Sequence, residues 1–326
     1  MIASADNVER MSREELQTIQ LERLKKVVAW AEEKSKFYRE KFAKANVCAS
    51  DIETLDDIVK LPFVTKSDIR HSDPLSRLTV PYSGIVRYHH SETLTGDYVH
   101  LYTKGDKDWD AELVKRTMIA AGVSSAAVVG LQGDLTDSRL MGVQSALEEI
   151  GAMAVPLGVG HKIWMKLLEN VGMDTLISTP QLIMQLIIQL QASGKNIADY
   201  PVKRIICINL DNIQNPLQAH IEERTKTKVF NLYASQELST AGMLYQCKEH
   251  LGQHVAEDAF LAEIVAFGSD AEVKEEHRMG ELVITTLTAE AMPLIRYRTG
   301  QAVSKTLEPC ACGRTFMRIA TPFSYL

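Results

Sequence analysis

Four side chains in the last third of the sequence could together hold a metal ion. Cys247 and His254 lie in the string CKEHLGQH, and Cys310 and Cys312 lie in PCACGR. Thiolates and an imidazole in this combination make a closed tetrahedral Cys₃His set of the kind that binds structural zinc. The spacing is not a standard zinc-finger spacing, His250 is a competing imidazole, and free thiols beside an unrelated histidine are the alternative. We expect a structural Zn²⁺ site formed by Cys247, His254, Cys310 and Cys312.

A second group of residues that could take part in chemistry lies in the segment 280–301, GELVITTLTAEAMPLIRYRTGQ. Its apolar residues predict two strands, and the second carries Arg296 and Arg298. A guanidinium at a strand end presents a fork of donors that suits a carboxylate or a phosphate. An ion pair on the surface is the alternative interpretation of both arginines.

The elements that must position these groups follow from the hydrophobic pattern. Ser12 and Glu15 form a capping box before a helical repeat, and short helices follow. Strands then alternate with helices, which indicates a largely parallel α/β sheet, and the final part contains strands joined by polar turns. We expect a helical module at 1–78, α/β subdomains at 79–234 and a β-rich subdomain with the zinc site at 235–326.

Composition excludes several classes of function. The net charge is −6 and the basic residues are scattered, which argues against nucleic acid and against an anionic membrane surface as partners. The N-terminus lacks an apolar signal core, and the longest apolar stretch is well short of the roughly 20 residues that span a bilayer. The five cysteines are an odd number, which favours a reducing compartment. We expect a cytoplasmic protein.

Two strings of the sequence resemble the phenylacetate–CoA ligase family of adenylate-forming enzymes. They are ERLKKVVAWAEEKSKFYREKF near the start and the segment 280–301, where the family pattern ends in Tyr-Arg-Thr-Gly-Asp and this chain ends in Gln301. The resemblance covers nearly the whole chain. It implies an α/β fold, the large N-terminal domain of the adenylate-forming superfamily, built from layered α/β subdomains and a β-rich subdomain.

The resemblance also marks positions that bind nucleotide in the family. The Ser/Thr/Gly-rich phosphate loop corresponds to residues 91–97, and the family's Tyr-Gly-x-Ser/Thr-Glu segment, which supplies a glutamate to magnesium, corresponds to 233–237. The candidates to contact nucleotide are Thr93, Thr95, Gly96, Tyr233 and Gln301, and the candidate catalytic residues are Glu237 and Arg298.

Several of these positions depart from the family pattern. The lysine of the phosphate loop is Asp97, one of its glycines is Thr93, and Glu92 adds a second negative charge that would repel a polyphosphate. Gln301 offers neutral hydrogen bonds where an aspartate would make stronger, charge-assisted ones. The aryl-acid loop corresponds to GDLTDSRLMG at 133–142, which offers a polar ligand more than an apolar wall.

These departures lead to three hypotheses. Because the chain also stops before the hinge and C-terminal lid of relatives, we expect no lid and a ligase-like core with lost or strongly impaired adenylation, acting as a binding or partner subunit beside a complete ligase. The first alternative is an active acid–CoA ligase that uses ATP, Mg²⁺ and CoA with a lid on a separate chain. The second is a sensor of a small carboxylate or nucleotide-like ligand read by Asp134, Arg139 and Arg298. Whether the chain is an enzyme or a homodimer stays open.

Overall fold

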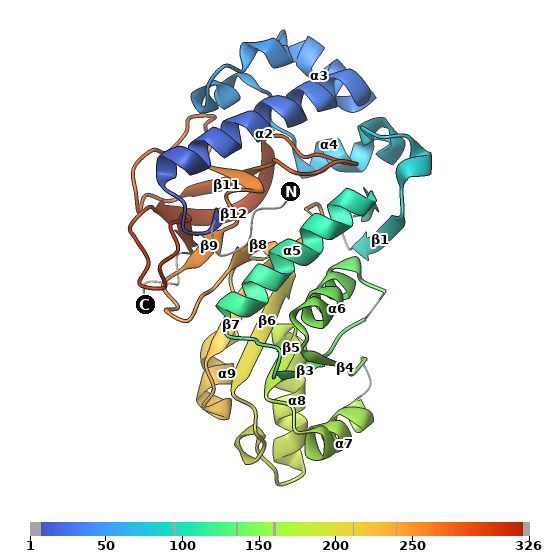
Figure 1. The fold of residues 1–326 in the computed structure, drawn as a ribbon, viewed down its shortest axis with the longest axis vertical. Coiled ribbons are helices and arrows are strands. Elements are labelled where there is room, and N and C mark those ends of the chain that lie inside the picture. The colour runs from blue at the N-terminus through green and yellow to red at the C-terminus, as the bar shows by residue number, and fades with distance from the viewer. Residues whose placement is uncertain are drawn as a thin grey trace. The chain divides into compact units, whose positions relative to one another are not determined.

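The computed structural model describes residues 8–93, 96–134, 136–158, 161–210, 212–238 and 240–321 of the 326-residue chain. The chain folds into two compact units, the first made of Met1–Trp109 with His254–Leu326 and the second of Asp110–Gln253. In Figure 1 the first unit carries the blue and red ribbons and the second the green and yellow ones. Among the described residues, no helix is both long enough and apolar enough to cross a membrane.

The second unit is built on a mixed sheet with the strand order β8-β7-β6-β5-β3-β4. Neighbouring strands are parallel except β7 and β8, which are antiparallel. The strands are β3 (Val128–Leu131), β4 (Met153–Pro156), β5 (Thr175–Ser178), β6 (Arg204–Leu210), β7 (Val229–Ser235) and β8 (Thr240–Tyr245). The predicted parallel α/β arrangement is therefore confirmed.

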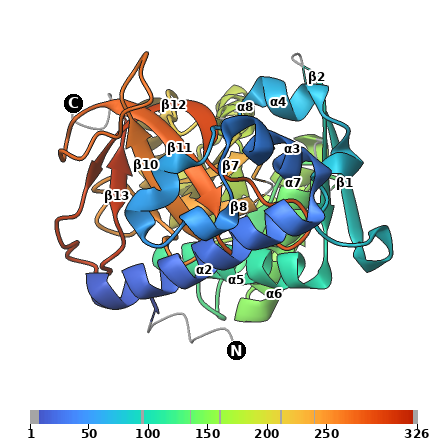
Figure 2. The ribbon, with the colours of Figure 1, turned by 90° about the horizontal axis from the view of Figure 1, so that it is seen from above.

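Helices cover this sheet. They are α5 (Lys104–Ala120), α6 (Ser138–Ile150), α7 (His161–Val171), α8 (Pro180–Ala192) and α9 (Gln218–Thr225). Buried residues of α7, α8 and α9 pack with those of β5, β6 and β7 in one apolar core, and α5 and α6 lie on the opposite face from α8 (Figure 2). Helix α8 begins as the sequence predicts, because Thr179 accepts a hydrogen bond from the Leu182 amide at 3.4 Å and Pro180 follows at the first helical position.

The first unit has strands in the order β10-β11-β12-β13-β9, and β10–β11, β11–β12 and β12–β13 are antiparallel pairs. They are β9 (Gln253–Val255), β10 (Phe260–Val265), β11 (Gly280–Thr286), β12 (Tyr297–Thr306) and β13 (Arg318–Ala320). The same unit contains α2 (Arg13–Lys34), α3 (Lys36–Ala45) and α4 (Lys66–His71), and α2 and α3 lie side by side (Figures 1 and 2). The capping box predicted at Ser12 and Glu15 is present at the start of α2.

Two boundaries differ from the sequence prediction for local reasons. Helix α5 begins at Lys104, earlier than Asp108, because Thr103 and Asp106 exchange side-chain hydrogen bonds with each other's amides at 2.9 and 3.0 Å and so cap the helix. Strand β12 begins at Tyr297 and runs to Thr306, so Arg296 lies just before the strand. Its φ of 50° is left-handed, and a residue with that backbone cannot continue a strand.

A hairpin of β1 (Arg87–Thr93) and β2 (Gly96–Tyr102) gives the first unit an acid-sensitive group. His100 on β2 is buried, and that burial, together with the charges of Arg77 and His89, lowers the pKa of His100 to about 3. The His100 imidazole therefore stays neutral in the folded state. In the unfolded chain it takes up a proton below the ordinary histidine pKa of about 6.5.

We therefore expect stability to fall as the pH drops from about 6.5 towards 3, by up to about 1.4 kcal/mol per pH unit from His100 alone. The variant His100→Gln should lose less free energy of unfolding between pH 7 and pH 4.5 than the parent chain, as measured by urea denaturation at both pH values. The same loss in both proteins would show that His100 is not responsible for the acid sensitivity.

Candidate metal centre and nucleotide-binding positions

The structure brings the four metal-ligand candidates together. Cys247, His254, Cys310 and Cys312 each place one ligand atom so that these atoms all lie within 4.8 Å of one another. His254 belongs to β9, Cys247 to the segment that precedes it, and the two remaining cysteines to the turn between β12 and β13. Cys247, His254 and Cys310 are buried and Cys312 is half-buried.

The donor set fits zinc. Zn–S bonds of about 2.3 Å in a tetrahedron put ligand atoms roughly 3.8 Å apart, so a small contraction of the cluster would complete the site. The Sγ of Cys312 is already 3.5 Å from Nε2 of His254. Nδ1 of His254 lies 3.3 Å from the Phe316 carbonyl, which can only accept a hydrogen bond, so Nδ1 carries the proton and Nε2 is left to bind a metal.

The local backbone and electrostatics favour the same chemistry. The Gly313 amide donates to the Cys310 carbonyl at 2.9 Å, and Gly313 has a φ of 84°, so a tight turn presents both cysteines to one side. Burial opposes ionisation of the Cys312 thiol, but hydrogen bonds with His254 and Arg314 outweigh it and lower the pKa of Cys312 to about 5. The thiolate is the form of cysteine that binds metals.

His250, the competing imidazole, is not part of this cluster. Its ring packs against Phe230 with 4.6 Å between the ring centroids, and its burial lowers the pKa of the imidazole. The structure therefore groups the cysteines with His254.

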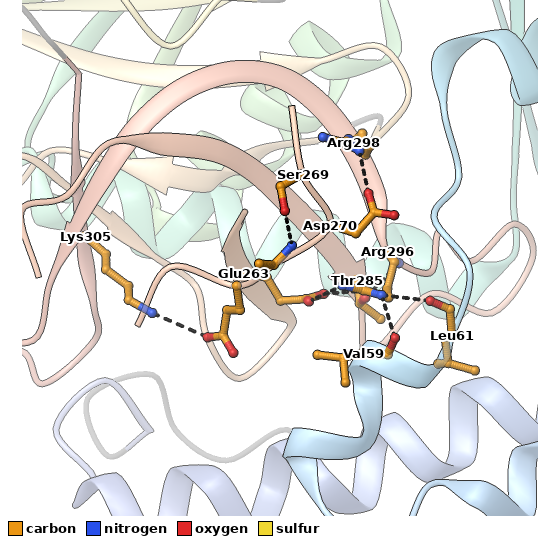
Figure 3. Close-up of polar contacts among 11 residues, drawn as sticks. Val59, Leu61, Glu263, Ser269, Asp270, Thr285, Arg296, Arg298 and Lys305 are labelled. Carbon is orange, nitrogen blue, oxygen red and sulfur yellow. Dashed lines mark hydrogen bonds and ion pairs between the residues drawn. The ribbon is translucent and has the colours of Figure 1, made fainter. Parts of the chain in front are cut away.

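The two arginines of the 280–301 segment have different surroundings. Arg298 donates from Nε to Glu281 at 2.9 Å, and its Nη2 and Nη1 lie 2.7 and 3.3 Å from Glu281 and Asp270. Its side chain is 24% exposed. The guanidinium that could have met a phosphate is thus occupied by two carboxylates, which is the ion-pair alternative. Figure 3 shows its contact with Asp270.

Arg296 is fully enclosed, and its side chain points to Glu263 of β10 (Figure 3). Nη2 and Nε lie 2.8 and 3.2 Å from the Glu263 carboxylate, and Nη1 donates to the carbonyls of Val59 and Leu61 at 3.1 and 2.8 Å. The Cζ atom of this guanidinium lies 3.9 Å from the centroid of the Phe63 ring. Arg296 therefore joins the helical part of the first unit to its strands.

The partner of Arg296 was not identified from the sequence. The signal was present, because Glu263 is the lone charged residue in the apolar string FLAEIV. A carboxylate in a buried strand requires a cation or several donors.

The positions expected to hold phosphate lie at the tip of the β1–β2 hairpin. Thr95 lies outside the described residues, while Thr93 and Gly96 are opposite each other as the last backbone pair. Most of the expected loop is therefore strand. The same register puts Glu92 opposite Asp97, so two negative residues occupy one cross-strand pair.

Tyr233 and Glu237 lie at the carboxyl end of β7 in the second unit, the edge at which open α/β sheets bind ligands. Tyr233 is buried, and Glu237 is half-buried with its carboxylate accepting a hydrogen bond from Ser235 Oγ at 2.7 Å. Gln301 is a half-buried residue of β12 in the first unit. Its backbone N–H donates a hydrogen bond to Thr299 Oγ1 at 3.2 Å.

The sensor candidates Asp134 and Arg139 are also engaged within the second unit. Arg139 pairs with Asp137 through Nε and Nη2 at 2.9 and 2.6 Å and donates to the Ala234 carbonyl at 3.3 Å. Asp134 accepts a hydrogen bond from the Thr136 amide at 2.9 Å. Arg139 could meet a ligand only by giving up a contact, whereas Asp134 is exposed and keeps further acceptor capacity.

No family model matches the chain. The phenylacetate–coenzyme A ligase of Thermus thermophilus is 31% identical to it over 96% of this chain and 71% of the relative. The enzyme of that name from Escherichia coli is 32% identical over 90% of this chain and 68% of the relative. The chain belongs to the phenylacetate–CoA ligase family. A crystal structure of 2-hydroxyisobutyryl-CoA ligase superimposes with a TM-score of 0.88, covering 98% of this chain and 70% of that one at 22% identity, which confirms the adenylate-forming fold.

The resemblance described above aligns Asp97, Thr93 and Gln301 with a lysine, a glycine and an aspartate of the family pattern. In the register of the β1–β2 hairpin Glu92 is the backbone partner of Asp97, and two negatively charged residues at one position would repel a polyphosphate.

Proposed function

We propose that the chain is a phenylacetate–CoA ligase-like core whose adenylation is lost or strongly impaired, and that it works as a binding or partner subunit of a cytoplasmic ligase system. The observation that carries this proposal is the double pairing of Arg298 with Glu281 and Asp270. The cation that the motif retains is neutralised within its own unit.

The charges around a nucleotide support the same proposal. Adenylation needs preorganised donors and a metal to stabilise the charge that develops on the α-phosphate. In this chain the phosphate hairpin carries Glu92 and Asp97, and the ribose position carries the neutral Gln301. Glu237 is the remaining acidic candidate for Mg²⁺, and a single half-buried carboxylate binds that ion weakly without the substrate phosphates.

The decisive experiment is acid-dependent exchange of pyrophosphate into ATP, with phenylacetate and a panel of other carboxylic acids. We expect the purified chain to stay at background while the Escherichia coli relative, as positive control, exchanges readily. Calorimetry with ATP and Mg²⁺ at millimolar concentration should show no binding. Exchange above background would overturn the proposal in favour of an active ligase whose lid is supplied by another chain.

The partner role has its own test. Light scattering after size-exclusion chromatography of this chain mixed with a complete ligase of the family should show a joint peak. Separate peaks, together with thermal stabilisation of the chain by a small carboxylate, would instead favour the sensor alternative.

We also propose that Cys247, His254, Cys310 and Cys312 hold one structural Zn²⁺. The proposal is supported by their ligand atoms, which lie within 4.8 Å of one another, and by the His254 proton on Nδ1. Bound there, the ion would fix the turn between β12 and β13 to β9. It would take no part in transfer chemistry, because a closed four-ligand site leaves no open position.

A further inference from the structure

A groove of about 660 Å³ lies within the first unit, away from every residue assigned above to nucleotide or metal. One wall is a stripe of α2 that includes Arg23, Lys26 and Trp30, and the other includes Trp109 and the segment that begins at Leu287. Small-molecule sites commonly measure about 300–1,000 Å³ and are lined by apolar and aromatic side chains. The groove has the size and the walls of a ligand site.

Two of the chain's three tryptophans, Trp30 and Trp109, line the groove. Trp30 is 38% exposed, whereas Trp164, the third, is buried in the core of the second unit. Exposed indole rings offer large, rigid apolar faces that are well suited to stacking on another planar ring.

One of the three cations near the two indoles is available to an anion. The Arg23 guanidinium lies 4.9 Å from the centre of the Trp109 ring, and Lys34 lies 5.5 Å from that of Trp30. Arg23 donates to the Asp258 carbonyl and lies 3.7 Å from the Asp258 carboxylate, and Lys34 is paired with Glu33. Lys26 is exposed on the groove and makes no ion pair with any described residue, so its ammonium is available to a ligand.

The acidic residue of the groove is committed elsewhere. Glu290 accepts a hydrogen bond from Thr103 Oγ1 at 2.6 Å, at the cap of α5, where the positive end of the helix dipole favours a carboxylate. Its carboxylate packs so closely on Gly105 that a Cβ there would lie 2.3 Å from Oε1. These contacts hold the Glu290 carboxylate at the start of α5.

The far wall of the groove is rigid. Asp106 accepts hydrogen bonds from the amides of Glu290 and Ala291 at 2.7 and 3.1 Å and from the Thr103 amide at 2.9 Å. These bonds fasten the segment after Leu287 to the start of α5. A groove that is already formed binds a ligand without the entropic cost of ordering its walls.

We propose that this groove binds a planar aromatic anion, whose ring packs on Trp30 and Trp109 and whose negative group pairs with Lys26. The site is independent of adenylation, since none of its residues belongs to the nucleotide positions. It gives the chain a binding activity that loss of the family reaction would leave intact.

The probes are 2-naphthoate, a planar aromatic carboxylate, and 2-naphthalenemethanol, its neutral analogue, each titrated into the full chain by calorimetry. We expect naphthoate to bind more tightly than the alcohol. The variant Lys26→Gln should weaken naphthoate about fivefold, the equivalent of about 1 kcal/mol, and leave the alcohol unchanged. The matched control Lys25→Gln removes an exposed lysine of α2 that does not line the groove, and it should leave both affinities unchanged.

A second variant, Trp30→Ala, should weaken both probes, because it removes a ring face and leaves the charge. Circular dichroism and the melting temperature would show that each variant is folded. The proposal is overturned if Lys26→Gln and Lys25→Gln have equal effects on naphthoate, if Trp30→Ala leaves both probes unaffected, or if naphthoate does not bind at millimolar concentration.

Discussion

Replacing Arg296 with alanine should lower the free energy of unfolding by about 3–5 kcal/mol, the usual cost of leaving a buried charge without its partner. The side chains of Arg296 and Glu263 are 3% and 5% exposed, so water cannot replace the lost guanidinium. The carbonyls of Val59 and Leu61 lose donors in the same step. Urea denaturation at neutral pH would measure the loss.

The pH dependence of this variant provides an internal check. Burial raises the pKa of Glu263, and Arg296 opposes that shift. Without the arginine the pKa should rise further, and stability is then lost as the pH increases through that raised value. The deficit of Arg296→Ala relative to the parent chain should therefore be smaller at pH 5 than at pH 8.

The matched control is Arg298→Ala, two residues along the same segment. Its pairs with Glu281 and Asp270 are partly exposed, and such pairs contribute about 0–1 kcal/mol. Equal losses of unfolding free energy in the two variants would contradict the conclusion that the buried ion pair of Arg296 stabilises the first unit more than the partly exposed pairs of Arg298. A joint Arg296→Met and Glu263→Leu variant should recover much of the stability, because it leaves neither charge unpaired.

The second large effect concerns the metal. Protein purified without added metal should contain about one zinc per chain, and Cys310→Ser with Cys312→Ser should abolish it and lower the melting temperature strongly, since binding to a structural zinc site contributes on the order of 10 kcal/mol to folding. Elemental analysis and thermal denaturation of the same preparations would test both statements.

Two controls isolate the cluster from general effects of losing a thiol or an imidazole. Cys48 is an exposed cysteine outside the cluster, so Cys48→Ser should keep the zinc. His254→Asn should lose it and His250→Asn should keep it. A double cysteine variant that retains both metal and stability would refute the site.

The sequence was informative wherever the deciding contacts are local. The alternation of strands and helices, the Thr179–Pro180 start of α8 and the Ser12–Glu15 capping box each depend on residues within a few positions of one another. The four metal-ligand candidates were chosen by residue type, because thiolates and imidazoles are chemically distinctive, and by the match of both cysteine segments to the family.

What the sequence could not supply were contacts between distant segments. Arg296 binds Glu263, 33 residues away, and the Leu61 carbonyl, 235 residues away, and no local pattern encodes either pairing. The hairpin register that sets Glu92 against Asp97 was equally hidden, because a glycine- and threonine-rich string fits a loop as well as a tight turn.

The divided first unit has a consequence for how the protein is made. Residues Asp110–Gln253 are contiguous, so the second unit can fold as soon as its last strand leaves the ribosome. Helices α2 and α3 must instead wait for partners such as Glu257, which binds Arg13, and Pro293, whose carbonyl binds Tyr38. At ordinary rates of translation the interval is roughly 10–50 s. During that time Leu16 of α2 lacks Phe316, with which it packs in the folded unit, and we expect chaperones to hold nascent chains at this stage.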